Sequence, residues 1–393
     1  MRCLTRISIS LVALCALFLV TVFFLPACSK KQPETKEIKI GAILVLTGPD
    51  ARSGQNARNG VEMVVEELNG KGGISGKKLR VIYEDDEGDP QKSVSAALKL
   101  ITVDNVPAII GPMWSTSVLA VAPLIEKNRR VLLSPTASAP KITYAGDYIF
   151  RNTYSDLYEG TKDAEYAYKQ LGYRKAGIIS VNLDAGIEIA NVFSKRFLEL
   201  GGTVVIKESY EAKTTDFRSL LAKFNEEPID FIYVMGYSEM GQLIKQAREL
   251  GIKYPFISTI MFEISDVIKI AGDAAEGTVY SFPSYDPEKG DETILTFAKK
   301  FKERYGVLPD PEAAFSYDAM KILCSVISEV GSDPVKIKNT LYQVKNYRGV
   351  TGETSFDQNG DVIKPIGFKK VEQGKYIWAV FEFKSKDKAK VGN

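Results

Sequence analysis

From residue 38 onward, hydrophobic and polar positions form two kinds of stretch that alternate along the chain. Short apolar runs, such as 40–46 and 131–134, are typical of strands buried on both faces. Between such runs lie longer stretches, such as 57–68 and 90–103, in which apolar residues recur at helical spacing. Strands that alternate with helices of this length predict right-handed βαβ units on parallel sheets.

The alternation stops after residue 134 and begins again near residue 157. The second block contains strand-like runs at 176–181, 203–210, 231–235, 255–259 and 278–282. Two consecutive blocks of this kind predict an α/β protein with two doubly wound lobes.

The C-terminal part has a different pattern. Three helical stretches at 292–305, 312–330 and 334–344 precede a region of turns and a hairpin, in which Asn359-Gly360 is a tight-turn signal. Because this part has too few strand-like runs for a third lobe, we expect it to complete the first two.

The N-terminus has the pattern of an export signal. Arg2 and Arg6 precede an apolar stretch at 7–24, which ends in the sequence LPAC at Cys28. This ending resembles a bacterial lipobox, so we expect a signal peptide over residues 1–27, a lipidated Cys28 and a polar tether to residue 37. An uncleaved membrane anchor is the alternative. Either interpretation places the remaining chain outside the cytoplasmic membrane.

Composition and charge exclude several function classes. The chain is 45% hydrophobic and 25% charged, carries a formal net charge of +2, and shows no basic cluster typical of nucleic-acid binding. It contains no histidine, which excludes a histidine-based triad, general base or metal ligand. Once the signal and the lipidated residue are set aside, Cys324 is the single remaining cysteine, so no internal disulfide is expected.

The motifs associated with catalysis or cofactors do not fit. The glycine-rich stretch 69–78 follows a helix and precedes a strand, the reverse of the order in a dinucleotide site. The acidic stretch 84–89 lacks the spacing of a calcium loop and is explained by a helix cap at Asp89. We therefore expect a protein that has no cofactor, no metal and no enzymatic activity. A hydrolase that uses only carboxylates is the alternative.

Hydroxyl-bearing side chains follow two neighbouring predicted strands. Trp114 and Ser115 come shortly after the run 106–110, and Thr136, Ala137 and Ser138 come shortly after the run 131–134. Doubly wound sheets bind ligands at the carboxyl ends of their strands, and a helix that begins near Ser115 offers free N–H groups to an anion. Plain helix capping is the alternative for each site, but two adjacent sites favour ligand binding.

Long stretches of the chain resemble the leucine/isoleucine/valine-type solute receptors of ABC importers. The resemblance is carried by IGAILVLTGPDARSGQNARNGVEMVVEELNGKGGISGKKLRVIYEDDEGDP, YIFRN, TDFRSLLAKF, GYSEMGQLIKQARELG and IAGDAAEGT. It implies the type I periplasmic-binding fold, in which two α/β lobes are joined by three hinge crossings. Residues 38–154 and 284–355 are then expected to form lobe one, and residues 155–283 and 356–388 to form lobe two.

The resemblance also implies a ligand between the lobes. Ser115 aligns with the serine that holds the ligand carboxylate. Thr136, Ala137 and Ser138 align with the strand end that orients the ligand. Trp114 stands where amino-acid receptors often carry a smaller residue, and we expect it to pack on the side chain of the ligand or on a cationic group of the ligand. Packing on the surface of the lobe is the alternative for Trp114.

The chain departs from the family in lobe two. Ile260 stands where the family has a glutamate, which makes Glu263 the nearest acid, with Asp184 and Glu239 as weaker candidates. Ala185 stands where an aromatic residue is common, and Tyr237 is a candidate to close over the ligand from lobe two. These departures leave open whether the ligand carries an α-amino group.

The leading hypothesis is an extracytoplasmic solute-binding lipoprotein of an ABC importer. It would capture an amino acid or a related carboxylate by hinge closure, act as a monomer and deliver the ligand to a membrane permease complex. A receptor that reports the same ligand to a membrane signalling partner is the alternative.

Overall fold

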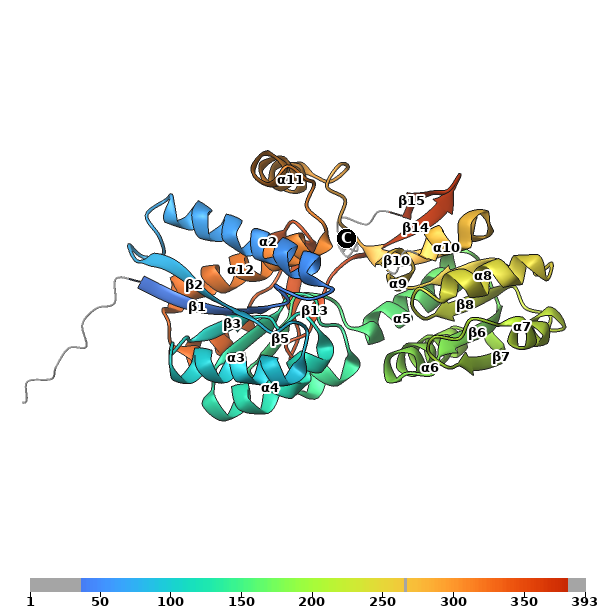
Figure 1. Ribbon diagram of the computed structural model, residues 1–393, viewed down its shortest axis with the longest axis horizontal. Coiled ribbons are helices and arrows are strands. Elements are labelled where there is room, and N and C mark those ends of the chain that lie inside the picture. The colour runs from blue at the N-terminus through green and yellow to red at the C-terminus, as the bar shows by residue number, and fades with distance from the viewer. Residues whose placement is uncertain (1–36, 265–266, 381–393) are drawn as a thin grey trace, which may run out of the picture. The chain divides into compact units, whose positions relative to one another are not determined.

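Five parallel strands form the first sheet of the computed structural model, which describes residues 37–264 and 267–380 (Figure 1). The spatial order is β2-β1-β3-β4-β5, so the strand order reverses between β1 and β3. The strands are β1 (Glu37–Leu44), β2 (Lys78–Asp85), β3 (Ala108–Ile110), β4 (Val131–Ser134) and β5 (Ile149–Arg151). The short strand β5 lies beyond the last strand that the sequence pattern predicted in this block.

Helices cover both faces of this sheet, as its apolar strands require. One face carries α2 (Ala51–Asn69) beside α12 (Pro311–Val330), and the other carries α3 (Pro90–Thr102) beside α4 (Ser115–Asn128) (Figure 1). The C-terminal helices α11 (Glu292–Tyr305) and α13 (Pro334–Leu341) also pack on this first lobe. Aspartates cap α3, α11, α12 and α13, three of them directly before a proline at the first helical position.

The second sheet has seven strands in the order β15-β14-β10-β9-β8-β6-β7. β6 to β10 are parallel, whereas β14 and β15 form an antiparallel hairpin at one edge. The strands are β6 (Lys175–Val181), β7 (Thr203–Tyr210), β8 (Phe231–Met235), β9 (Phe256–Ser258), β10 (Val279–Pro283), β14 (Ile366–Glu372) and β15 (Lys375–Val380).

Helices cover both faces of the second sheet as well. One face is covered by α5 (Asp156–Glu165), which continues as a π-helical turn (Tyr166–Gln170), and by α6 (Asp184–Glu199). The other face is covered by α7 (Arg218–Asn225), α8 (Met240–Glu249) and α10 (Val267–Ala271), and α9 (Met261–Ile264) lies next to α10. Each sheet therefore has its own core, and the chain passes three times between the two lobes, as expected.

The third passage lies later in the chain than expected. β11 (Tyr347–Gly349), β12 (Gly352–Phe356) and β13 (Val362–Ile363) form a small antiparallel sheet. Phe356 and Val362 are buried in the core of the first sheet, and the Phe356 ring meets the Phe150 ring edge-on at 5.5 Å. The boundary expected at residue 356 is thus corrected to the segment between β13 and β14, because these apolar side chains bury themselves in lobe one.

The expected signal peptide and tether fall outside the described residues, apart from Glu37, which begins β1. Among residues 37–264 and 267–380, no helix combines the length and the apolar character needed to cross a membrane.

Candidate ligand-binding site

A cavity of about 400 Å³ lies at the carboxyl ends of strands from both sheets. This is the position at which doubly wound sheets bind ligands, and the volume is in the range of small-molecule sites. The lining comes from the ends of β4, β8 and β9, from the first turns of α4, α5 and α6, and from nearby loops. It consists of Ser115, Thr116, Leu119, Ser138, Ala139, Lys141, Asp156, Glu159, Leu183, Ala185, Glu188, Ile189, Met235, Tyr237, Thr259, Ile260 and Met261.

Ser115 lies at one end of this lining because the chain turns sharply after β3. Gly111 adopts a φ of +88°, and a Cβ on it would lie 2.1 Å from the Ile43 carbonyl oxygen, so only glycine fits this turn. α4 then begins at Ser115, and its hydroxyl accepts a hydrogen bond from the Ala139 N–H at 3.1 Å. The free N–H groups and partial positive charge of a helix start favour an anion here.

The loop after β4 is held against the pocket by Arg151, whose side chain is fully buried. One guanidinium nitrogen donates to the carbonyl oxygens of Ser138 and Ala139, both at 2.9 Å, and Nε pairs with Asp361 at 2.6 Å. The backbone conformation of Ser138 and Ala139 is therefore set by a buried ion pair rather than by the loop itself.

Two acids from α5 approach the cavity from the second lobe. The Asp156 N–H donates to the Ser138 carbonyl oxygen at 3.0 Å, and burial raises the pKa of its carboxyl although the Ser138 hydroxyl opposes this shift. Glu159 lies one turn further along α5 and is 2% exposed. Burial, followed by the charge of Asp156, raises the pKa of Glu159 to about 7.

The remaining wall is largely apolar. The start of α6 brings Leu183 and Ala185 to the cavity, and a Cβ on Gly186 would lie 2.4 Å from the Val181 carbonyl oxygen, so this helix start lies directly on β6. Met235 at the end of β8 and Met261 at the start of α9 complete this wall. Such a wall suits the hydrocarbon part of a small ligand.

Of the residues predicted from the sequence, Ser115, Ser138 and Tyr237 line the cavity. Thr136 and Ala137 lie behind the lining: the Thr136 hydroxyl donates to the Met113 carbonyl oxygen at 2.9 Å, and the Ala137 side chain is 2% exposed. These two residues shape the loop rather than face the cavity.

Trp114 lies outside the cavity lining and packs on lobe one, which was the alternative interpretation of this residue. Its indole nitrogen is so close to Gly88 that a Cβ there would lie 2.9 Å from it, and the ring packs on the cluster that contains Leu46 and Tyr83. The side chain thus fills the space left by a glycine in the β2–α3 loop.

Glu263 also lies outside the lining. Its carboxylate accepts from Lys369 at 2.8 Å and from the Tyr280 hydroxyl at 2.5 Å, which ties α9 to β14 and β10. Asp184 is the first residue of α6. Its side chain and the residue Cys28 lie outside the described part of the chain.

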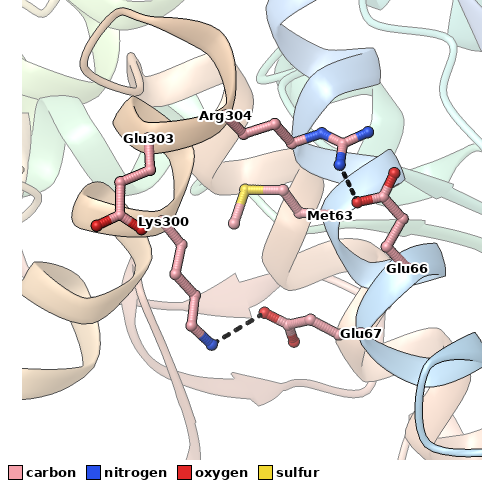
Figure 2. A pocket seen from close by; sticks show the side chains of 6 residues that line it. All are labelled: Met63, Glu66, Glu67, Lys300, Glu303 and Arg304. Atoms are coloured by element: carbon pink, nitrogen blue, oxygen red, sulfur yellow. Dashed lines mark hydrogen bonds and ion pairs between the residues drawn. The ribbon is translucent and has the colours of Figure 1, made fainter.

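A second hollow, of about 340 Å³, lies between α2 and α11 and belongs to the first lobe alone (Figure 2). Figure 2 shows two ion pairs across it: Arg304 contacts Glu66, and Lys300 pairs with Glu67, with 3.8 Å between Nζ and Oε1. Such exposed ion pairs belong to the contact between the two helices. Within the described ranges, no cluster of three acidic or cysteine side chains could hold a metal ion.

Comparison with known proteins agrees with this architecture. Residues 37–375 match the family of periplasmic binding proteins. The Leu/Ile/Val-binding protein of Escherichia coli (strain K12) is 29% identical over 349 residues, which cover 87% of this chain and 91% of that protein.

Solved structures give the same result. The leucine binding protein from Thermotoga maritima superposes with a TM-score of 0.74 at 28% identity, over 87% of this chain and 97% of the other. The branched-chain amino acid binding protein from Streptococcus pneumoniae, in complex with isoleucine, gives 0.73 at 28% identity, over 86% and 97%. The chain belongs to the periplasmic binding protein family and has its type I fold, as the sequence analysis expected.

Proposed function

We propose that this chain is the solute receptor of an ABC importer and captures a small carboxylate-bearing solute, such as an amino acid, between its two lobes. The observation that supports this most directly is the cavity lined from both sheets, with Ser115 at the start of α4 on one side and the apolar wall on the other. The relatives are binding proteins for branched-chain amino acids.

Within this proposal, Ser115 and the free N–H groups of the first turn of α4 receive the ligand carboxylate. Ser138 and Tyr237 orient the ligand, and the apolar wall with Leu183, Met235 and Met261 contacts its hydrocarbon part. The proposed role is binding without turnover, as in the binding proteins to which the chain is similar.

We further propose that Cys28 is lipidated, that the mature chain is a monomer anchored outside the cytoplasmic membrane, and that it delivers its ligand to a membrane permease. The LPAC sequence at the end of the apolar N-terminal stretch supports the anchor. Mass spectrometry of the N-terminal peptide from membranes should find a diacylglyceryl mass on Cys28. An N-terminal peptide that begins upstream of Cys28, or a Cys28 peptide without added mass, would contradict lipidation.

The test of the binding function is a thermal-shift screen of amino acids and carboxylates, combined with mass spectrometry of the compound that co-purifies. A true ligand raises the melting temperature by mass action and is recovered chemically unchanged. No stabilisation by any member of the screen, together with an empty pocket in mass spectrometry, would contradict the proposed function. Recovery of a converted product would contradict binding without turnover.

A further inference from the structure

We propose that Glu159 is the specificity-determining residue of this pocket: its carboxylate receives the cationic nitrogen of the ligand, so the receptor selects solutes that carry a cation as well as a carboxylate. This inference rests on the proposed solute-binding function. It names the class of ligand, which the carboxylate site at Ser115 alone leaves undefined.

The position of Glu159 is fixed by two donors from different elements. Oε1 accepts the Ile260 N–H at 2.9 Å and the Ser281 hydroxyl at 2.7 Å. Both bonds use the same oxygen, and no donor among the described residues reaches Oε2. Since Glu159 lines the cavity, we infer that this second oxygen accepts from a ligand donor. The carboxylate is thus oriented before the ligand arrives.

The surroundings of Glu159 make a cationic ligand favourable. Ile260 and Met261 are apolar neighbours on the lining, and an ionised carboxylate that is 2% exposed is costly without a positive partner. A ligand cation would supply that partner, and Asp156, three residues earlier on the same helix face, would share it. A ligand that carries only a carboxylate would add a second negative charge instead.

The charged and titratable groups around Glu159 come from several elements. Asp163 follows one turn later on α5, and the Tyr233 hydroxyl of β8 donates to it at 2.8 Å. The groups that face Glu159 or share its cavity are Asp156 and Asp163 on α5, Tyr154 before it, Tyr233 and Tyr237 from β8, Glu188 on α6 and Lys141 after β4. Negative groups outnumber the single lysine on this lining.

Recognition of a cation by Glu159 makes ligand binding depend on pH. In the free protein, burial, followed by the charge of Asp156, raises the pKa of Glu159 to about 7, so a part of its carboxyl groups is protonated at neutral pH. A bound cation favours the ionised form and lowers this pKa, so binding releases a proton. Affinity for a cationic ligand should therefore fall as the pH is lowered from 8 to 6. The chain contains no histidine that could produce the same dependence.

The experiment is isothermal titration calorimetry with two probes of the same carbon skeleton, L-leucine and 4-methylpentanoate, which lacks the ammonium group. We expect L-leucine to bind at least tenfold more tightly at pH 8. At pH 7, titrations in buffers of different ionisation enthalpy should show proton release with L-leucine.

Two variants separate the role of Glu159 from general effects on the fold. Glu159→Gln keeps an oxygen for Ile260 and Ser281 but removes the charge, so it should weaken L-leucine binding at least tenfold, abolish proton release and spare 4-methylpentanoate. Glu312→Gln is the matched control. Burial and Asp310 also raise the pKa of Glu312 to about 7, but this residue lies outside the cavity lining. Glu312→Gln should change neither the affinity for L-leucine nor the proton release on binding.

The outcomes distinguish this inference from the function on which it rests. If 4-methylpentanoate binds as tightly as L-leucine, or if Glu159→Gln leaves the preference and the proton release intact, the role of Glu159 is overturned while solute binding stands. If no amino acid or carboxylate binds at any pH, the proposed function is contradicted, and the inference with it.

Discussion

Arg151 and Asp361 form a buried ion pair that joins β5 to the turn between β12 and β13, with Nε 2.6 Å from the carboxylate. The Arg151 side chain is fully buried, and the same guanidinium holds the loop carbonyl groups of Ser138 and Ala139. This pair therefore connects the stability of lobe one to the shape of the ligand pocket.

Asp361→Ala should lower the free energy of unfolding by about 3 kcal/mol, because it leaves a buried guanidinium without its counter-charge. Urea denaturation monitored by circular dichroism measures this loss. Arg304→Ala is the control, since it removes an exposed pair with Glu66 and should cost less than 1 kcal/mol. Equal losses in the two variants would show that the buried pair has no special importance.

Ser115→Ala should weaken ligand affinity by about 1–3 kcal/mol, as expected for the loss of a hydrogen bond to a charged group. Trp114→Phe should change affinity less than twofold, because Trp114 lies against Gly88 and outside the cavity lining. Calorimetry with the ligand found by screening measures both values. Unchanged affinity in Ser115→Ala, or a large loss in Trp114→Phe, would reverse these two assignments.

Lys369→Met should lower the free energy of unfolding by about 3 kcal/mol, because it leaves Glu263 partly buried without its cation. Ligand affinity of the folded variant should stay within twofold, since neither residue lines the cavity. Glu263→Gln should behave in the same direction. A Glu263→Gln variant with normal stability but no ligand binding would instead make Glu263 a ligand residue.

The free protein should be more stable at pH 5 than at pH 8. Glu159 and Glu312 both have a pKa of about 7 in the folded chain, above the ordinary value of a glutamate. The folded state therefore binds more protons than the unfolded state between about pH 4.5 and pH 7, and the free energy of unfolding falls as the pH rises through this window, by at most about 1.4 kcal/mol per pH unit for each group.

Urea denaturation of the free protein at pH 5, 6, 7 and 8 measures this dependence. Each of the variants Glu159→Gln and Glu312→Gln should flatten the profile, because each removes a carboxyl group whose pKa is raised in the folded chain. A free energy of unfolding that rises from pH 5 to pH 8 would show that these carboxyl groups have ordinary pKa values.

The order of strands and helices could be predicted because each buried strand leaves a continuous apolar run and each helix a regular repeat. β5 was missed because its three residues, Ile149–Arg151, end in an arginine that becomes buried only through Asp361, more than two hundred residues later. The same distance in sequence concealed the packing of Phe356 and Val362 on lobe one.

The candidate site could be predicted mainly on its first-lobe side; from lobe two, Tyr237 was the predicted residue that lines the cavity. Ser115 and Ser138 follow strand ends, and strand ends are visible in the sequence. Asp156, Glu159 and Asp163 lie on one face of α5, and acids at this spacing are typical of a solvent-exposed helix face. They are pocket or core residues only because α5 packs against β8 and β10, a tertiary contact without a local signal.

The apolar wall with Met235 and Met261 bears on how narrowly the receptor discriminates among side chains. Methionine is unbranched and has several rotatable bonds, so it can fill the space around differently branched hydrocarbon groups. Beside these two residues, Ala185 leaves room where a larger side chain would set a sharp limit. The receptor should therefore be permissive toward the length and branching of the aliphatic part of its ligand, and a cell that carries it could draw on a mixture of nutrients rather than on one compound.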